Sequence, residues 1–186
     1  MTASTPSSTF WFWDFLKLLL GPKMLVMLLT GFSSGLPLLL TGSTIKWWMR
    51  EEGLDLTTIG FFGLVGLPYT LKFVWAPVMD WFVPPHLGRR RGWMLGTQIS
   101  LFVAISLIGF TNPISNLLSV VVLCALITFL SASQDIVLDA YRREFLKDEE
   151  LGIGSSIFIG GYRLGLLVAG AFALFLVDQE WLSWQT

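Results

Sequence analysis

The sequence contains little charge and few of the side chains that bind metals. Of its 186 residues, one is a cysteine (Cys124), one is a histidine (His86), and 13% are charged. One cysteine excludes an internal disulfide, and one histidine gives no basis for a zinc or haem site, so we expect no cofactor. No nucleophile is paired with a base in the way that an enzyme would need. A net charge of −1 gives no reason to expect binding to nucleic acid.

Apolar residues, in contrast, are abundant. They make up 54% of the chain and the mean hydropathy is +0.68, whereas about 25% of the residues of a soluble domain are charged. A membrane-spanning helix needs about 20 mostly apolar residues. Runs of about this length occur at residues 24–45, 59–79, 93–110, 117–138 and 153–177. The sequence therefore predicts an all-α, polytopic membrane helix bundle over residues 24–186, in which a sixth span begins near residue 181.

The first 23 residues form a separate N-terminal segment. Residues 1–9 are polar, and residues 10–20 are apolar and rich in aromatic side chains but too short to span a bilayer. This pattern is typical of a helix that lies in the membrane interface. A cleaved signal peptide is the alternative, although no positive charge precedes the apolar run and no small-residue cleavage site follows it.

The basic residues are concentrated on one side of the predicted membrane. The N-terminal segment, the second-to-third loop and the fourth-to-fifth loop carry Lys17, Lys23, Arg89, Arg90, Arg91, Arg142, Arg143 and Lys147. The opposite side carries Lys46 and Arg50. Because lysine and arginine are retained on the cytoplasmic side, this distribution predicts a cytoplasmic N-terminus in a multi-pass membrane protein.

Two pairs of glycines have the spacing of helix-packing faces. Gly31 and Gly35 are four residues apart in the first run, and Gly161 and Gly165 are four apart in the fifth. Small residues at this spacing allow two helices to approach closely. Both static bundles and bundles with moving helices use such faces, so the glycines predict packing without choosing between the two.

Three ionisable residues, Lys72, Asp135 and Arg163, lie inside the apolar runs. A charge at the bilayer centre costs about 2.5–3.5 kcal/mol even on a lenient scale, so such residues are rare and commonly functional. Lys72 lies near the cytoplasmic end of its run, where it either extends to the headgroups or binds an anionic group. Arg163 lies about 15 Å into its run. We expect it to face the interior and to bind a carboxylate, either that of Asp135 or that of a substrate.

The fourth run ends with two aspartates, Asp135 and Asp139, whose spacing of four places them on one helix face. Asp139 is close to the membrane boundary, where it can pair with an arginine one turn further on. Asp135 lies one turn deeper and follows Gln134, and we expect both to line a central cavity. An acidic residue in this position is suited to proton coupling. The alternative is a permanent salt bridge to one of the two interior cations.

The segment between the second and third runs begins with Asp80 and contains Gly88, Arg89, Arg90 and Arg91. An acidic residue at a helix end, followed by a short basic loop with a glycine, is similar to the signature loop of the major facilitator superfamily. The arginines alternatively serve only as an orientation signal.

Several consecutive motifs together resemble the AmpG-like muropeptide permeases of the major facilitator superfamily. The matching segments are residues 31–37, 58–66, 72–80, 84–93, 131–140 and 161–165, so the resemblance covers residues 24–184. Trp81 departs from the superfamily pattern, in which an arginine often follows the aspartate.

This resemblance implies import of N-acetylglucosaminyl-anhydro-muramyl peptides, driven by the proton gradient across the bacterial inner membrane, for peptidoglycan recycling. Such carriers have twelve spans in two six-helix halves, so the chain is expected to form an incomplete N-terminal half whose partner is a second half. A transporter of another anionic solute such as acetyl-CoA is an alternative function. A membrane scaffold is a further one, although a scaffold has no need of ionisable residues inside the bundle.

Overall fold

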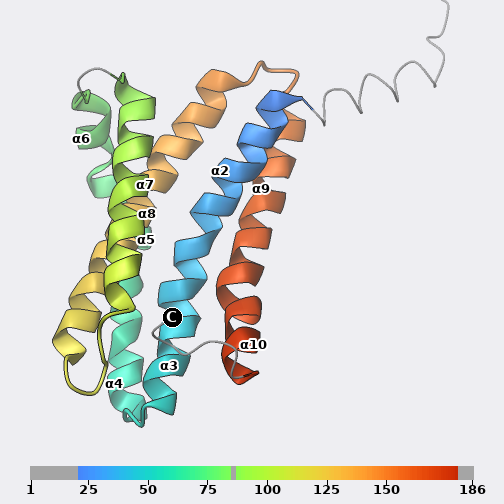
Figure 1. Cartoon of the computed structure of the whole chain (residues 1–186). Coiled ribbons are helices and arrows are strands. Elements are labelled where there is room, and N and C mark those ends of the chain that lie inside the picture. Colours follow the sequence, from blue (N-terminus) through green and yellow to red (C-terminus); the bar gives the residue numbers. More distant parts are fainter. Residues whose placement is uncertain (1–20, 85–86, 180–186) are drawn as a thin grey trace, which may run out of the picture.

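The computed structural model describes residues 21–84 and 87–179, and every regular element in these ranges is a helix (Figure 1). Five helical segments are long and apolar enough to cross a membrane. They are Pro22–Glu51, Leu56–Val74, Arg89–Ile108, Leu117–Phe145 and Leu151–Asp178. The predicted all-α bundle with five spans is therefore confirmed. The interfacial helix and the sixth span that the sequence predicts lie outside the described residues.

The first segment is one long helix with a wider turn in its middle. It consists of α2 (Pro22–Leu39), a π-helical turn η1 (Leu40–Thr44) and α3 (Ile45–Glu51). Pro37 has no N–H group, so a carbonyl in the preceding turn loses its helical partner, and helices commonly bend or widen at such positions. The Thr41 hydroxyl donates to the carbonyl oxygen of Pro37 at 2.9 Å. The predicted span ends at residue 45, with the apolar run, but the helix continues to Glu51 through residues that include charged side chains.

The second segment is a series of short helices. It comprises α4 (Leu56–Phe61), a 3-10 helix η2 (Phe62–Gly66), α5 (Leu67–Leu71), a 3-10 turn η3 (Lys72–Val74) and α6 (Ala76–Trp81). A 3-10 helix has about three residues per turn. Phe62 and Val65 are therefore on one face of η2, where both are buried, and Gly63 and Gly66 are on another. Pro68 stands in the first turn of α5.

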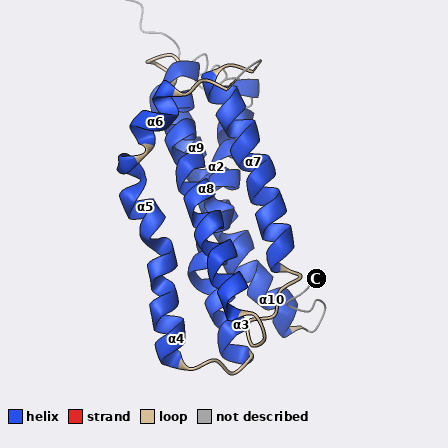
Figure 2. Cartoon of the chain, turned by 90° about the vertical axis from the view of Figure 1, so that its left-hand side faces the viewer, coloured by secondary structure: helices blue, strands red, loops and turns tan. Residues whose placement is uncertain are grey.

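The remaining helices are α7 (Arg89–Ile108), α8 (Leu117–Phe145) and α9 (Leu151–Leu167), and α9 continues through a π-helical turn η4 (Val168–Phe172) into α10 (Ala173–Asp178). In Figure 1, α2 lies beside α9, and α8 crosses behind α7 towards them. Figure 2 shows α4 and α5 at the opposite edge of the bundle from α7, whereas α6 contacts the start of α7, where the Trp93 indole N–H donates to the Met79 carbonyl oxygen at 3.1 Å. The helix α8 therefore contacts each of the other four segments.

Two apolar clusters fill the bundle. One lies between α3, η2, α7 and α8 and contains Ile45, Met49, Phe62, Val65, Leu101, Ala104, Ile108, Val120, Cys124 and Ile127. The other lies between α2, α8 and α9 and contains Met24, Met27, Leu138, Leu146 and Phe158. Between them, α8 carries polar residues at the positions where α2, α5 and α9 approach it.

The contact between α2 and α9 is a close approach of two backbones. A Cβ atom added to Gly31 or Gly35 would overlap the carbonyl oxygens of Phe158 or Tyr162, respectively. A Cβ atom added to Gly161 or Gly165 would overlap the carbonyl oxygens of Leu28 or Phe32. The two glycine pairs that the sequence placed on packing faces thus meet each other. At such distances glycine Cα–H groups can also contact the facing carbonyl oxygens.

Ion pairs join the helices at the end of the bundle where α2 begins. The Nζ atom of Lys23 lies 2.7 Å from Oε2 of Glu150, the residue before α9. Glu150 also accepts a hydrogen bond from the backbone N–H of Lys147 at 3.0 Å. The Lys23 contact, and then the Lys147 contact, lower the pKa of the Glu150 carboxyl group. These bonds connect the first segment to the loop before the fifth.

Candidate functional site

Asp135 of α8 lies at the centre of a polar cluster to which four helical segments contribute. Its Oδ1 atom accepts a hydrogen bond from the hydroxyl group of Ser34 in α2 at 2.5 Å. It also interacts electrostatically with Tyr69 of α5, Lys72 of η3 and Tyr162 of α9. The cluster therefore combines one carboxylate, one ammonium group and three hydroxyl groups in the bundle interior. We call these five residues the Asp135 cluster.

The residues around Asp135 on α8 fix the position of the second segment. The Trp75 indole N–H donates to the Ser133 hydroxyl at 3.0 Å, and the Trp75 ring lies 4.9 Å from that of Phe129. The Tyr69 hydroxyl lies beside Ser131, two residues before Ser133 on α8. These contacts place Tyr69 and Lys72 next to the carboxylate of Asp135.

Lys72 lies near Asp135 without forming a direct ion pair. It is half-buried, and its charge acts on the Asp135 carboxylate. The ion pairs among the described residues do not include one between these two side chains. A permanent salt bridge between them, which the sequence left open, is thus not formed in this structure. A ligand with its own carboxylate has a free cation available here.

Gln134 lies inside the packed bundle. The side chain is 1% exposed, and its amide oxygen and nitrogen have no hydrogen-bond partner among the described residues. Consecutive residues on a helix point about 100° apart, so Gln134 points into the packed bundle while Asp135 points towards α2. In this structure Gln134 therefore does not line a cavity beside Asp135, and its role in substrate binding or coupling stays a prediction.

Arg163 does not pair with Asp135 in this structure. Arg163 is exposed, and it forms no ion pair with any described residue. Because Gly161 and Gly165 point towards α2, the residue between them lies about 200° around the helix, on the opposite side. Tyr162 occupies the side that faces Asp135. A role of Arg163 in binding a substrate carboxylate stays a prediction.

The remaining candidate on α8, Asp139, forms the ion pair that the sequence suggested. Its Oδ1 atom lies 3.1 Å from Nη2 of Arg142, three residues further along α8. The side chain is exposed. Asp139 therefore lies at the edge of the Asp135 cluster, where it contributes a second negative charge near Asp135.

An arginine in the first turn of α7 connects three helical segments. The guanidinium group of Arg90 lies 2.7 Å from Oδ1 of Asp80 and 2.8 Å from Oε1 of Glu144 on α8. Arg89 donates to the backbone carbonyl oxygen of Asp80 at 3.2 Å. Gly88 has a φ of 76°, a conformation that favours glycine. Arg90 thus does more than mark orientation, because it joins the start of α7 to α6 and to the end of α8.

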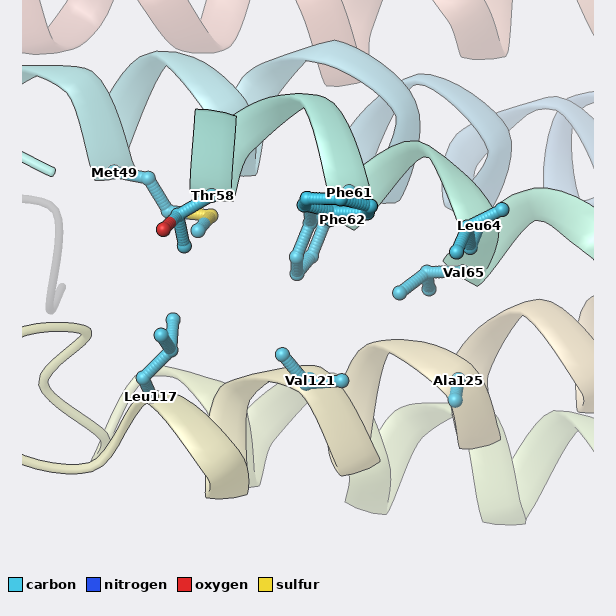
Figure 3. Close-up of a pocket in the computed structure, with 9 residues that line it drawn as sticks. All are labelled: Met49, Thr58, Phe61, Phe62, Leu64, Val65, Leu117, Val121 and Ala125. Atoms are coloured by element: carbon cyan, nitrogen blue, oxygen red, sulfur yellow. The ribbon is translucent and has the colours of Figure 1, made fainter. Parts of the chain in front are cut away.

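An apolar pocket lies at the opposite end of the bundle from Arg90. It has a volume of about 460 Å³. In Figure 3, side chains of α4 and η2 face side chains of α8 across this pocket. The lining residues are Met49, Thr58, Phe61, Phe62, Leu64, Val65, Leu117, Val121 and Ala125. With one hydroxyl group and no charge in its lining, this pocket does not contribute to the Asp135 cluster. Among the described residues, no group of histidine, cysteine and acidic side chains is arranged to hold a metal ion.

Comparison with known proteins assigns the family. The family model described as acetyl-coenzyme A transporter 1 matches residues 23–183. The chain belongs to this family. It is 51% identical over 172 residues to the anhydromuropeptide permease of Escherichia coli (strain K12). This match covers 92% of this chain and 35% of the permease.

Two further relatives match most of the same chain. The chain is 46% identical over 154 residues to an uncharacterized protein of Haemophilus influenzae, covering 83% of this chain and 36% of that protein. It is 37% identical over 155 residues to putative transporter AmpG 1 of Rickettsia bellii, covering 81% and 38%. The resemblance to AmpG-like permeases is confirmed, and the match is to the N-terminal part of these relatives. The chain spans about a third of their length.

The family and the helices agree on a multi-pass membrane protein. The relatives that carry functional names are called permeases or transporters, and none of those names describes an enzyme. Sequence reasoning did not single out Ser34, Tyr69 and Tyr162 of the Asp135 cluster. Ser34 and Tyr162 lie within the two pairs of packing glycines, and this position is the one sequence feature that could have indicated that they face another helix.

Proposed function

We propose that the protein is a secondary active transporter that imports anhydromuropeptides from the periplasm into the cytoplasm together with protons, for peptidoglycan recycling. The observation that carries this proposal is the 51% identity to the E. coli anhydromuropeptide permease over 92% of this chain. The chain covers 35% of that permease, so the proposal concerns the full-length gene product, with a second six-helix half as the partner of these helices.

The Asp135 cluster suits this activity. Anhydromuropeptides carry hydroxyl groups, amides and peptide carboxylates, and the cluster offers the ammonium group of Lys72 and the hydroxyl groups of Ser34, Tyr69 and Tyr162. Asp135 is the acidic residue available to take up and release a proton. We assign binding to the cation and hydroxyl groups and proton coupling to Asp135.

Acetyl-CoA is the second candidate substrate, because the family model is described by an acetyl-coenzyme A transporter. Both candidates are large and anionic, so the Asp135 cluster alone does not choose between them. The higher similarity to a permease named for anhydromuropeptides favours the first.

Uptake measurements distinguish the two substrates. The full-length gene product would be expressed in an E. coli strain that lacks its own anhydromuropeptide permease. We expect uptake of radiolabelled anhydromuropeptide to be restored, and to be abolished by a protonophore. Uptake of labelled acetyl-CoA by membrane vesicles of the same strain, without anhydromuropeptide uptake, would move the assignment to the second candidate. The absence of both activities would contradict a role in transport of these solutes.

The orientation of the chain is open to a direct test. We propose that the N-terminus and the loops carrying Arg89–Arg91 and Lys147 are cytoplasmic, because the basic residues gather there. On a Cys124→Ala background, a cysteine at Lys147 should react with a membrane-impermeant maleimide only after the cells are opened. A cysteine at Ser115, in the loop between α7 and α8, should react in intact cells. The reverse pattern would contradict the proposed topology.

A further inference from the structure

Two basic residues at the other end of the bundle remain without a role. Lys46 and Arg50 lie on α3, four residues apart and therefore on one helix face. Neither forms an ion pair with another described residue. Together with Trp47 of α3 and with Leu56 and Ile59 of α4, they line a cavity of about 140 Å³.

The Lys46 side chain is directed towards the middle of the membrane and not towards the nearby end of its helix. Side chains on a helix lean towards its N-terminus, and the N-terminal side of α3 is the membrane interior. The Nζ atom of Lys46 lies 3.9 Å from the point that a Cβ atom on Gly63 would occupy. Gly63 is seven residues past the start of α4, which corresponds to a depth of about 10 Å. A lysine that served only to reach lipid headgroups would extend the other way.

Acidic side chains close to this pair have other partners. The Oε1 atom of Glu52 accepts a hydrogen bond from the Trp48 indole N–H at 3.2 Å. Asp55 accepts bonds from the backbone N–H and the hydroxyl group of Thr58 at 2.9 Å and 2.6 Å, which caps the N-terminus of α4. Glu51 lines a different cavity, on the side of α3 that faces α10. The positive charge of Lys46 and Arg50 is therefore available to a ligand.

The chemistry of the cavity fits a carboxylate attached to a sugar or a short peptide. An ammonium group and a guanidinium group can bind one carboxylate together, and a guanidinium group does so with two parallel bonds. Trp47 is 52% exposed, so its ring offers an apolar face for the C–H groups of a sugar or side chain. A water molecule takes about 30 Å³ in the liquid, so about 140 Å³ holds a carboxylate with its adjoining carbons and not a whole disaccharide.

We propose that Lys46 and Arg50 form an entry subsite that binds a carboxylate of the transported sugar-peptide at the periplasmic end of the bundle. This proposal rests on the proposed function and orientation given above. The subsite lies on the same chain segment as Ser34, since α3 continues α2. A ligand captured by Lys46 can therefore proceed along one helix towards the Asp135 cluster.

The test compares a carboxylate ligand with its neutral counterpart. We would measure uptake of an anhydromuropeptide and of the same molecule with its peptide carboxylates amidated, in cells that express the full-length gene product. Lys46→Gln should raise the KM for the acid about tenfold, the effect of losing one hydrogen bond to a charged group. The KM for the amide should change by less than about twofold, with the maximal rate unaltered. Arg50→Gln should act in the same direction.

Two controls separate this role from general effects of charge or aromatic loss. Lys147→Gln removes an exposed lysine at the opposite end and should leave both KM values unchanged. Trp81→Ala removes a tryptophan that is 88% exposed and should leave uptake of both ligands unchanged, whereas Trp47→Ala should weaken uptake of both ligands.

A lipid phosphate is the other possible source of an oxyanion for Lys46, and uptake into proteoliposomes with and without anionic lipid tests it. A Lys46→Gln effect that appears only with anionic lipid would assign the cation to a lipid phosphate and overturn the proposal.

A direct binding measurement with purified full-length protein keeps the subsite testable apart from transport. Preferential binding of the acid over the amide, lost in Lys46→Gln, would sustain the subsite even if no uptake occurred, and in that case only the transport proposal would fail. Equal binding of acid and amide by the unmodified protein would overturn the subsite, whatever the uptake. A protein that neither binds nor transports these ligands would overturn both proposals.

Discussion

Replacing Gly161 by alanine is expected to destabilise the protein strongly, whereas the same change at the neighbouring Gly160 is expected to be harmless. The added Cβ atom of Gly161→Ala overlaps the Leu28 carbonyl oxygen of α2. Backbone atoms cannot rotate away as a side chain does, so the helices must separate along their contact. Overpacking of this kind costs about 1–3 kcal/mol, which corresponds to a fall in Tm of about 2–12 °C for a protein of this size.

Gly160 is the matched control because it lies on the same helix and has open space around its Cβ position. Alanine favours a helix over glycine by up to about 1 kcal/mol, so Gly160→Ala should leave Tm unchanged or raise it slightly. The measurement is the loss of the monodisperse peak in size-exclusion chromatography after heating the detergent-purified protein. Equal Tm values for the two variants would show that α2 and α9 are not in backbone contact.

Replacing Asp135 by asparagine is expected to abolish concentrative uptake. The asparagine has nearly the same shape and can still accept the hydrogen bond from Ser34, but it cannot carry a proton. The charged and titratable groups that face it are Lys72 from η3, Tyr69 from α5 and Tyr162 from α9, with Asp139 on its own helix. Because none of these replaces a carboxylate, uptake of labelled anhydromuropeptide should fall to the level of the host strain.

The matched control is Asp148→Asn, which removes an exposed carboxylate that pairs with Arg143 outside the spans. Both variants should be present in the membrane at the parental amount. Downhill exchange of labelled for unlabelled substrate should survive in Asp135→Asn, since that reaction needs binding and no net proton movement. Uptake at the parental rate in Asp135→Asn would leave Asp135 with a structural role only.

The arrangement of the spans was predictable because each is a long apolar run, and composition alone determines where a membrane helix is possible. The ends of the helices were less accurate. The predicted first and fourth spans stopped at residues 45 and 138, but the helices continue to Glu51 and Phe145. A hydropathy argument detects the apolar core of a span and not the charged turns that extend beyond the hydrocarbon.

The site was predictable in part, for a geometric reason. A charge inside an apolar run identified Asp135 and Lys72, and the structure places them in one cluster. The direction of a side chain depends on which helix face packs where. The spacing of Gly161 and Gly165 predicted a packing face, and Arg163 lies on the side of the helix opposite to that face. The sequence alone did not show that α2 is the helix packed against these glycines. Ser34 and Tyr162 became visible only when that partner was known.

The central claim is that movement of the sugar-peptide is coupled to protons through the Asp135 cluster. Its most direct test is proton movement in proteoliposomes that contain the full-length gene product and an internal pH indicator, with no ion gradient imposed. Addition of anhydromuropeptide outside should acidify the lumen, and Asp135→Asn should remove the signal while Asp148→Asn retains it. Entry of labelled anhydromuropeptide into the liposomes without any change in internal pH would contradict the account.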